Sequence, residues 1–233
     1  MKNLQEKFQE VGGRFITPLP DFKIKLEKIK ALVFDWDGVF NNGSKSVVQP
    51  ATFSEADSMG LNILRFDLWC KQQILPKVFI VTGEDNPTAL HFSQRENLHG
   101  IYKKIKNKTD AIAHLCANNK IEPCEIACFG DDITDLSMFK ICGLRFLLKR
   151  SASPLLEEYI VQSGLCDYVT GHSGYEHGVR EATELLMGMQ GSYADRISAR
   201  YNFDQQYQSY ITERGKIQPR FFLFDGEVRE YFL

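Results

Sequence analysis

The sequence lacks a strong excess of either charge, any long apolar run, and an apolar stretch near its start. Its 28 lysines and arginines face 30 aspartates and glutamates, a net charge of −2, which argues against a strongly basic nucleic-acid-binding protein. Its apolar runs are far shorter than the ~18 residues of a membrane helix, so no membrane partner is expected. The first ten residues are charged and lack the apolar core of a secretory signal.

The six cysteines lack the regular spacing of a disulfide framework. Cys124 and Cys128 are the closest pair, and no second pair of Cys or His follows at the spacing of a zinc site. Several of the others lie inside apolar segments, where free thiols are commonly buried. We therefore expect reduced thiols in a cytoplasmic protein.

What the sequence does have is an alternation of strand-like and helix-like segments. Hydrophobic residues make up 43% of the chain, enough for a sizeable core. Compact apolar runs predict strands at 29–35, 78–83, 125–132, 143–148 and 166–170. Apolar residues at helical spacing predict helices at 61–73, 109–119, 136–141, 155–161 and 179–189. This alternation indicates an α/β fold, with a mainly parallel sheet covered by helices on both faces.

Composition divides the chain into three expected parts. Residues 1–29 are polar and form an N-terminal arm, and residues 30–190 form the α/β core. Residues 191–233 are rich in aromatic residues, which argues against a disordered tail. We expect this C-terminal extension to pack on the core or on a neighbouring subunit. Inside the core, a small β-hairpin is expected from Ser44 to Phe53.

Three of the predicted strands end in unusual polar residues. Because ligands of open α/β sheets bind beyond the carboxyl ends of the strands, these residues are expected to converge. They are Asp35, Asp37, Thr82, Gly83, Asp131 and Asp132, with Asp135 three residues further on. Crowded carboxylates repel one another, and a divalent cation relieves the repulsion. Oxygen donors without Cys or His favour Mg²⁺ over Zn²⁺.

The same edge offers groups for a phosphate. Thr82 has a hydroxyl, Gly83 an accessible backbone N–H, and Lys108 opens a predicted helix, whose N-terminus also favours an anion. Lys103, Lys104 and Lys106 are close rivals of Lys108, and a solvated run of charges is the usual interpretation of such a segment. Trp36, between two aspartates, is expected to point away from the site into the core.

These residues fall into motifs of a known family. DWDGVF, IVTG, NK before a helix, and FGDDITD stand in the order of the four motifs of the haloacid dehalogenase (HAD) superfamily, which they resemble. Asn42-Gly43, residues 56–61, and the DYVT and HGVRE segments resemble the 3-deoxy-D-manno-octulosonate 8-phosphate (KDO 8-phosphate) phosphatases and related nonulosonate 9-phosphate phosphatases. The resemblance covers about residues 30–190 and implies a Rossmann-like HAD fold.

The resemblance implies a role for each motif residue. Asp35 would be the nucleophile that forms an aspartyl-phosphate, and Asp37 the general acid and then the base. Thr82, Gly83 and Lys108 would hold the phosphoryl group. Asp35, the backbone carbonyl of Asp37, and Asp131 would ligate Mg²⁺, while Asp132 assists and Asp135 orients Lys108 or the groups around the metal. The implied function is a Mg²⁺-dependent phosphomonoester hydrolase acting on a small sugar-acid phosphate.

The spacing of the motifs leaves no room for a cap domain. Asp37 and Thr82 are separated by 44 residues, and Thr82 and Lys108 by 25, and neither gap holds a separate domain. The phosphatases that this chain resembles close their sites by tetramerising. The resemblance therefore implies a homotetramer, with the hairpin near Val47 to Phe53 in the subunit contact.

Two residues depart from the KDO 8-phosphate pattern. Glu84 stands where those enzymes have a basic residue, and His177 where they usually have Arg. With Gly83 and Asp57, these two are the candidate substrate contacts. Glu84 leaves open a HAD phosphatase for another class of sugar phosphate. A catalytically silent assembly or regulatory domain is a further alternative, although all four motif residues Asp35, Asp37, Lys108 and Asp131 are present.

Overall fold

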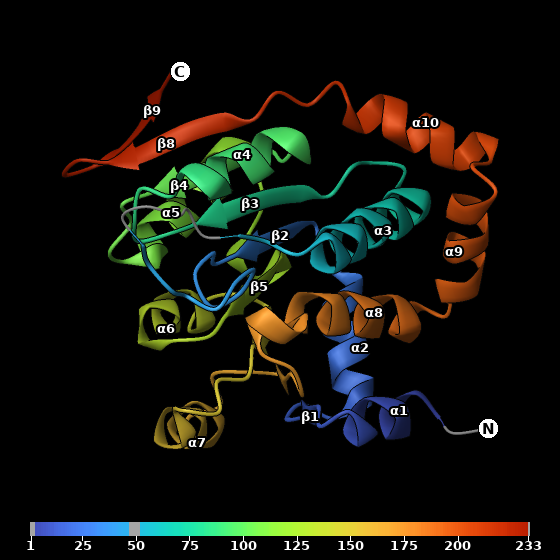
Figure 1. Ribbon diagram of the computed structural model, residues 1–233, viewed down its shortest axis with the longest axis horizontal. Helices are drawn as coiled ribbons and strands as arrows, with labels where there is room; N and C mark the ends of the chain where they lie inside the picture. Colours follow the sequence, from blue (N-terminus) through green and yellow to red (C-terminus); the bar gives the residue numbers. More distant parts are fainter. Residues whose placement is uncertain (1–2, 47–51, 233) are drawn as a thin grey trace.

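The computed structural model describes residues 3–46 and 52–232. Its centre is a nine-stranded sheet in the order β1-β7-β6-β5-β2-β3-β4-β8-β9 (Figure 1). The strands are β1 (Arg14–Phe15), β2 (Ala31–Phe34), β3 (Lys77–Val81), β4 (Gly100–Lys103), β5 (Ile126–Gly130), β6 (Leu144–Leu147), β7 (Tyr168–Val169), β8 (Arg220–Phe224) and β9 (Val228–Tyr231). All neighbours pair in parallel except β1 with β7 and β8 with β9. The predicted α/β fold with a mainly parallel sheet is confirmed.

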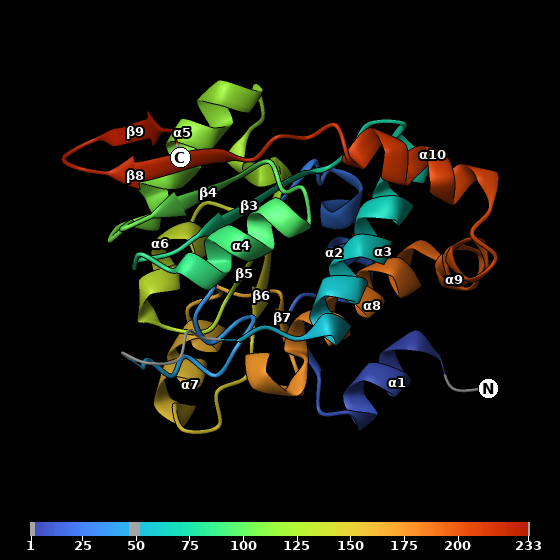
Figure 2. The ribbon, with the colours of Figure 1, turned by 45° about the horizontal axis from the view of Figure 1, so that its top comes forward.

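Helices cover both faces of the sheet (Figure 2). They are α1 (Leu4–Glu10), α2 (Leu19–Glu27), α3 (Glu55–Gln72), α4 (Pro87–Arg95), α5 (Lys108–Asn119), α6 (Leu136–Phe139), α7 (Pro154–Gln162), α8 (Gly178–Gln190), α9 (Tyr193–Tyr201) and α10 (Gln205–Arg214). Short 3₁₀ turns lie at Pro123–Glu125, Ile133–Asp135 and Gly174–Glu176. Among the described residues, no helix is both long and apolar enough to cross a membrane.

The alternation of side chains along each strand divides the apolar residues into two cores. Leu32 and Phe34 of β2 point into one core with α2, α3, α4 and α8. Ala31 and Val33 point into the other, with α5, α6 and α7. Since successive residues of a strand face opposite sides of a sheet, a strand buried on both faces is apolar throughout. All four residues of β2 are buried, which places this strand at the centre of the molecule.

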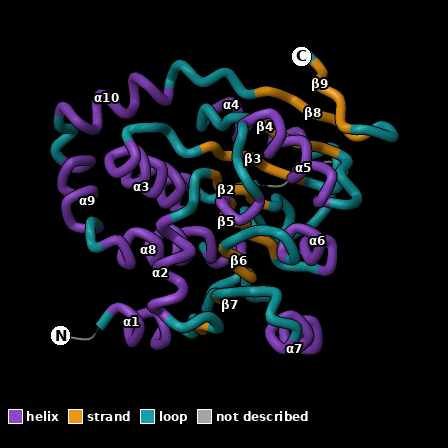
Figure 3. Tube along the Cα trace, turned by 180° about the vertical axis from the view of Figure 1, so that it is seen from behind, coloured by secondary structure: helices purple, strands orange, loops and turns teal. Residues whose placement is uncertain are grey.

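Both ends of the chain extend the same sheet. In the N-terminal arm, β1 adds an edge strand to β7. In the C-terminal extension, α9 and α10 run past α3, and β8 then adds to β4 (Figure 3). The ring centroids of Tyr207 and Tyr210 lie 5.1 and 5.2 Å from that of Phe66 in α3. These contacts pack the C-terminal extension against α3.

The structure adds strands that the apolar pattern did not predict. β4 reads GIYK, too short and too polar at its end to stand out from the loop around it. β8 and β9 form a hairpin around Gly226, whose φ of +77° suits glycine. Half of the hairpin predicted from Ser44 to Phe53, residues 47–51, lies outside the described residues. Residues 44–46 and 52–54 beside them are loop.

Candidate active site

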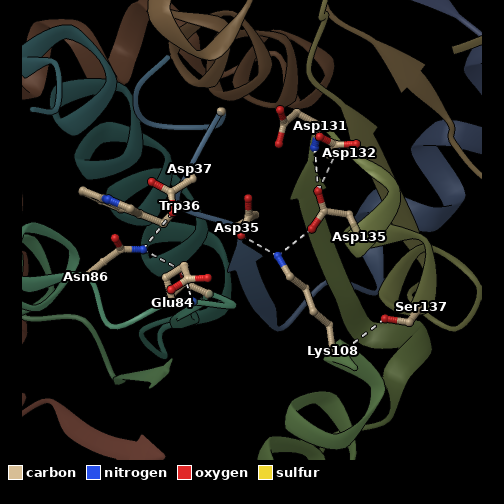
Figure 4. Close-up of polar contacts among 12 residues, drawn as sticks. Asp35, Trp36, Asp37, Glu84, Asn86, Lys108, Asp131, Asp132, Asp135 and Ser137 are labelled. Carbon is tan, nitrogen blue, oxygen red and sulfur yellow. Dashed lines mark hydrogen bonds and ion pairs between the residues drawn. The ribbon is translucent and has the colours of Figure 1, made fainter. Parts of the chain in front are cut away.

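Three neighbouring strands deliver the polar residues to one edge of the sheet. β2 pairs with both β3 and β5, so the residues that follow these strands emerge side by side. Asp35, Asp131 and Asp135 each place a carboxylate oxygen within 4.8 Å of the other two (Figure 4). The three groups come from two loops that are almost 100 residues apart in sequence, and the parallel sheet is what joins them.

Lys108 is the lysine of the basic run that enters the site. It is the first residue of α5, follows the N-cap Asn107, and its side chain is only 1% exposed. Its Nζ lies 2.5 Å from Oδ1 of Asp35 and 2.5 Å from Oδ1 of Asp135. Burial alone would lower the pKa of Lys108, but the two carboxylates outweigh it and raise that pKa. Lys108 is therefore a fixed positive charge, whereas Lys103 pairs with Asp85.

Asp135 ties Lys108 to the loop after β5. Its Oδ2 accepts hydrogen bonds from the backbone N–H groups of Asp131, at 2.8 Å, and Asp132, at 3.0 Å. Asp132 itself caps the next turn by accepting from the backbone N–H of Ile133 at 2.7 Å. Asp135 thus holds the loop that carries Asp131 while its other oxygen faces Lys108.

Asp37 has its own partners, which sequence reasoning missed. Asn86 Nδ2 donates to Asp37 Oδ2 at 2.9 Å and to Thr82 Oγ1 at 2.8 Å, and the ammonium of Lys45 pairs with the same Asp37 oxygen. Asn86 precedes Pro87 at the start of α4, so its position as a helix N-cap on a site loop was a signal that could have found it. Lys45 offered no comparable signal.

The backbone between the two aspartates is shaped by Trp36 and Gly38. Trp36 is fully buried and stacks on Phe40 at 5.2 Å, so its ring points away from the site as predicted. Gly38 has a φ of +87°, and a Cβ there would lie 2.1 Å from Oδ2 of Asp131. A side chain at Gly38 would therefore displace Asp131.

Burial and crowding set the electrostatics of the site. Burial raises the pKa of Asp35 to about 8, against the lowering effect of Lys108, and Asp135 adds to the rise. Burial and Asp135 raise the pKa of Asp131 to about 7, although the guanidinium of Arg150 pairs with Asp131 and lowers it. Arg150, like Asn86 and Lys45, is a residue that the sequence analysis did not single out. Lys108 and Arg150 thus leave the three carboxylates of Asp35, Asp131 and Asp135 short of positive charge.

The residues present fit a hard divalent cation. Oδ1 of Asp131 and Oδ1 of Asp37 are buried, and neither has a hydrogen-bond partner within the described part of the chain. Buried carboxylate oxygens without partners are costly unless they bind an ion. The donors are all oxygens, which suits Mg²⁺.

The remaining candidate substrate contacts lie in two different places. Gly83 and Glu84 follow Thr82 at the site, and the backbone N–H of Glu84 approaches Thr82 Oγ1 at 3.4 Å. Asp57 is instead fully buried in α3, where its Oδ1 accepts from the backbone N–H of Arg180 at 2.8 Å. His177 Nδ1 lies 3.6 Å from Asp57 Oδ2.

The pair of Asp57 and His177 therefore joins α3 to the start of α8. No contact between described residues joins either side chain directly to Asp35. The structure brings these two candidates together with each other and leaves them apart from the phosphoryl-binding groups.

Comparison with known proteins shows which family the chain resembles. A family model described as haloacid dehalogenase-like hydrolase matches residues 67–182. The KDO 8-phosphate phosphatase of Escherichia coli (strain K12) is 27% identical over 175 residues, which cover 73% of this chain and 86% of that protein. That of Salmonella typhi is 28% identical over 171 residues, with 72% and 84% covered.

Solved structures share the fold. A hydrolase of HAD subfamily III A from Legionella pneumophila superposes with a TM-score of 0.66 at 26% identity, covering 79% of this chain and 96% of that one. The KDO 8-phosphate phosphatase of Moraxella catarrhalis, solved with magnesium, phosphate and KDO, gives a TM-score of 0.63 at 22% identity, covering 78% and 99%. The chain has the HAD Rossmann-like fold, matches the haloacid dehalogenase-like hydrolases over residues 67–182, and is similar to their KDO 8-phosphate phosphatases.

Proposed function

We propose that this enzyme is a Mg²⁺-dependent phosphomonoester hydrolase that acts on a sugar-acid phosphate of the KDO 8-phosphate or nonulosonate 9-phosphate type. The observation that carries the proposal is the different setting of two carboxylates. Asp35 is buried against Lys108 at 2.5 Å, whereas Asp37 is more exposed and is held by Asn86 at 2.9 Å. Carboxylates in such different environments suit different chemical roles.

In the first step Asp35 is the nucleophile. Its carboxylate oxygen forms a bond to phosphorus, and the bond from phosphorus to the sugar oxygen breaks. Asp37 gives its proton to that sugar oxygen as it leaves. Lys108, the Thr82 hydroxyl and the Gly83 N–H hold the phosphoryl oxygens, so that positioning and charge neutralisation supply most of the rate enhancement.

In the second step water releases the phosphate. Asp37, now a carboxylate, takes a proton from the water, whose oxygen bonds to phosphorus while the bond to Asp35 breaks. Inorganic phosphate leaves, Asp35 is again a carboxylate, and Asp37 is again protonated. Asn86 keeps Asp37 in place through both proton transfers.

Asp35, Asp131 and the backbone carbonyl of Asp37 would hold Mg²⁺, with Asp132 and Asp135 supporting them. When bound, the ion supplies positive charge opposite the phosphoryl oxygens and the crowded carboxylates. Support comes from the unpartnered Oδ1 of Asp131 and from the magnesium in the related Moraxella catarrhalis structure.

The proposal includes a homotetramer in the cytoplasm. A capless site needs another means of excluding water, and a neighbouring subunit would provide it. All six cysteines are free thiols, which a reducing compartment keeps stable. Light scattering of the purified protein measures the assembly, and a monomer at micromolar concentration would contradict it.

The test of the function is phosphate release from a panel of sugar and sugar-acid phosphates. The wild type with Mg²⁺ is compared with the wild type in EDTA and with Asp35→Asn. We expect release that needs both the metal and Asp35, with the highest kcat/KM on a sugar-acid phosphate. A best substrate that is a neutral sugar phosphate would favour another class of HAD phosphatase. No turnover, even of an aryl phosphate, would favour a silent assembly domain.

A further inference from the structure

Two cavities flank the phosphoryl site, one on each side of the loop that carries Asp37. A cavity of about 460 Å³ is lined by Lys45, Glu84, Asp85 and Asn86 among others. A second cavity, of about 410 Å³, begins at Gly38 and Asp131 and runs between the loops after β6 and β7. We call the second one the Arg150 cavity. Its lining is Gly38, Asn41, Asn42, Asp131, residues 149–152 and residues 173–176.

The two cavities differ in charge. The first carries Glu84, Asp85 and Lys45; Lys45 is paired with Asp37, and Asp85 is paired with Lys103. The Arg150 cavity carries Lys149 and Arg150, with Glu176 at its rim and Asp131 at its floor. In the first cavity the lysine is paired and Glu84 repels an anionic group, whereas the second cavity presents Lys149 and the exposed part of Arg150 to such a group.

One side of the Arg150 guanidinium is bound by carboxylates, and the other side faces the cavity. Its Nη2 pairs with Oδ2 of Asp131, and its Nη1 lies 3.5 Å from Oδ2 of Asp132. The side chain is nevertheless 36% exposed, and it lines the cavity. A guanidinium has five N–H donors in a rigid fork, so these contacts leave donors for a further anion. A planar fork of this kind matches a carboxylate in a bidentate pair.

The shape of the cavity also fits a sugar. Its wall is formed by small residues (Gly38, Ser151, Ala152, Ser173 and Gly174), which leave room beside the guanidinium. Gly174 packs so closely on the loop of Asp37 that a Cβ there would lie 2.1 Å from the carbonyl oxygen of Gly38. The Tyr175 side chain, 68% exposed at the same turn, offers a ring to the edge of a sugar.

We propose that the Arg150 cavity is the subsite for the carboxylate of the substrate, and that Arg150 is the specificity-determining residue that binds it. The inference rests on the proposed phosphatase function and adds to it how a sugar acid is distinguished from a neutral sugar. It also explains how Glu84 can stand where related enzymes have a basic residue: the positive charge comes from the loop after β6 instead.

The test compares two substrates that differ only in the carboxylate. KDO 8-phosphate is assayed beside its analogue with a hydroxymethyl group in place of the carboxylate, in the wild type, Arg150→Gln and Arg150→Lys. Because Arg150 also pairs with Asp131, its substitution can lower the rate of hydrolysis of both substrates. The ratio of the two kcat/KM values removes this shared effect.

We expect Arg150→Gln to lower that ratio by roughly 10- to 100-fold, mainly through KM of the acidic substrate, as the loss of a charged bidentate pair does. Arg150→Lys keeps the positive charge but not the planar guanidinium, and we expect it to lower the ratio less than Arg150→Gln does. The control is Lys140→Gln, which removes the same charge from an exposed position outside the cavity and should leave the ratio unchanged.

The outcomes separate the two proposals. If the wild type hydrolyses neither substrate nor an aryl phosphate, the proposed function fails. If the wild type prefers KDO 8-phosphate and both Arg150 variants keep that preference, the function stands and Arg150 is not the specificity residue. Should Arg150→Gln prove unstable by thermal unfolding, Arg150→Lys decides alone, and an unchanged ratio in it overturns the inference.

Discussion

The side-chain amide of Asn86 donates a hydrogen bond of 2.9 Å to Oδ2 of Asp37 and one of 2.8 Å to Oγ1 of Thr82. One residue on the loop after β3 thereby fixes two groups from different motifs. In the proposed reaction, Asp37 must reach the leaving oxygen and later the water. Asn86 is therefore a positioning residue, and its contribution is separable from that of Asp37.

We expect Asn86→Ala to lower kcat by roughly 10- to 100-fold, because a mispositioned acid loses most of its general acid–base contribution. The pH dependence of kcat should also change, since one hydrogen bond to the Asp37 carboxylate is lost. Steady-state kinetics across pH measures both. Asn202→Ala is the control, because that side chain is exposed and contacts only Ser198 among described side chains. A kcat within twofold of the wild type would refute a positioning role for Asn86.

A second expectation concerns the stability that Lys108 provides. In Lys108→Met, the buried carboxylates of Asp35 and Asp135 lose their common partner. Removing one partner of a buried ion pair typically destabilises a protein by about 3–5 kcal/mol. Urea unfolding in EDTA at pH 9, above the pKa of about 8 of Asp35, measures the loss of unfolding free energy, and activity with Mg²⁺ should disappear in the variant.

A double-mutant cycle provides the control for Lys108. Asp35→Asn combined with Lys108→Met removes one of the stranded charges, so the pair of changes should destabilise the protein less than the sum of the two. Additive effects would mean that Lys108 and Asp35 do not interact in the folded protein.

A third expectation separates the structural role of Asp57 from a substrate contact. Burial raises the pKa of Asp57 to about 6, against the hydrogen bond from Arg180 and the charge of His177. The folded protein then binds a proton that the unfolded chain releases near pH 4. Stability from this group is complete at low pH and falls as pH rises from about 4 through 6, by up to about 3 kcal/mol.

Asp57→Asn keeps an acceptor for the backbone N–H of Arg180 and removes the charge. We expect its unfolding free energy, relative to the wild type, to rise between pH 4 and 6.5, while kcat/KM changes less than threefold. A large loss of kcat/KM with unchanged stability would mean that Asp57 contacts the substrate. Urea unfolding at several pH values and steady-state kinetics decide between the two.

The residues that the sequence predicted are those whose position follows from a local pattern. Asp35 and Asp131 come directly after buried strands, and Lys108 opens a helix, so a strand end or a helix start was enough to place them. The parallel order of β5, β2 and β3 then brought them to one edge.

The residues that were missed depend on contacts distant in sequence. Arg150 reaches Asp131 only because β6 lies beside β5, and Asn86 reaches Asp37 across 49 positions. The contact of Asp57, a candidate substrate residue, with the backbone N–H of Arg180, 123 positions away, was not predicted either. Periodicity describes the burial of a segment but not which distant backbone group will need an acceptor.

The last expectation concerns acid stability and His99, which precedes β4. Its Nδ1 accepts a hydrogen bond from the backbone N–H of Val78 at 3.1 Å, so the folded protein needs the neutral ring. Burial, helped by the charges of Lys77 and Arg65, lowers the pKa of His99 to about 3. The unfolded chain binds a proton below about pH 6.5, while the folded protein does not until about pH 3.

Stability from His99 is therefore complete above pH 6.5 and is lost as pH falls towards 3, by up to about 5 kcal/mol. His99→Asn places an amide oxygen near the position of Nδ1 and cannot be protonated. We expect the variant to be less stable than the wild type at pH 7.5 through lost packing, and the difference to shrink or reverse by pH 4.5. Chemical unfolding at the two pH values measures this. A difference that is the same at both would mean that His99 is not a buried neutral acceptor, and that the carboxylates alone determine acid unfolding.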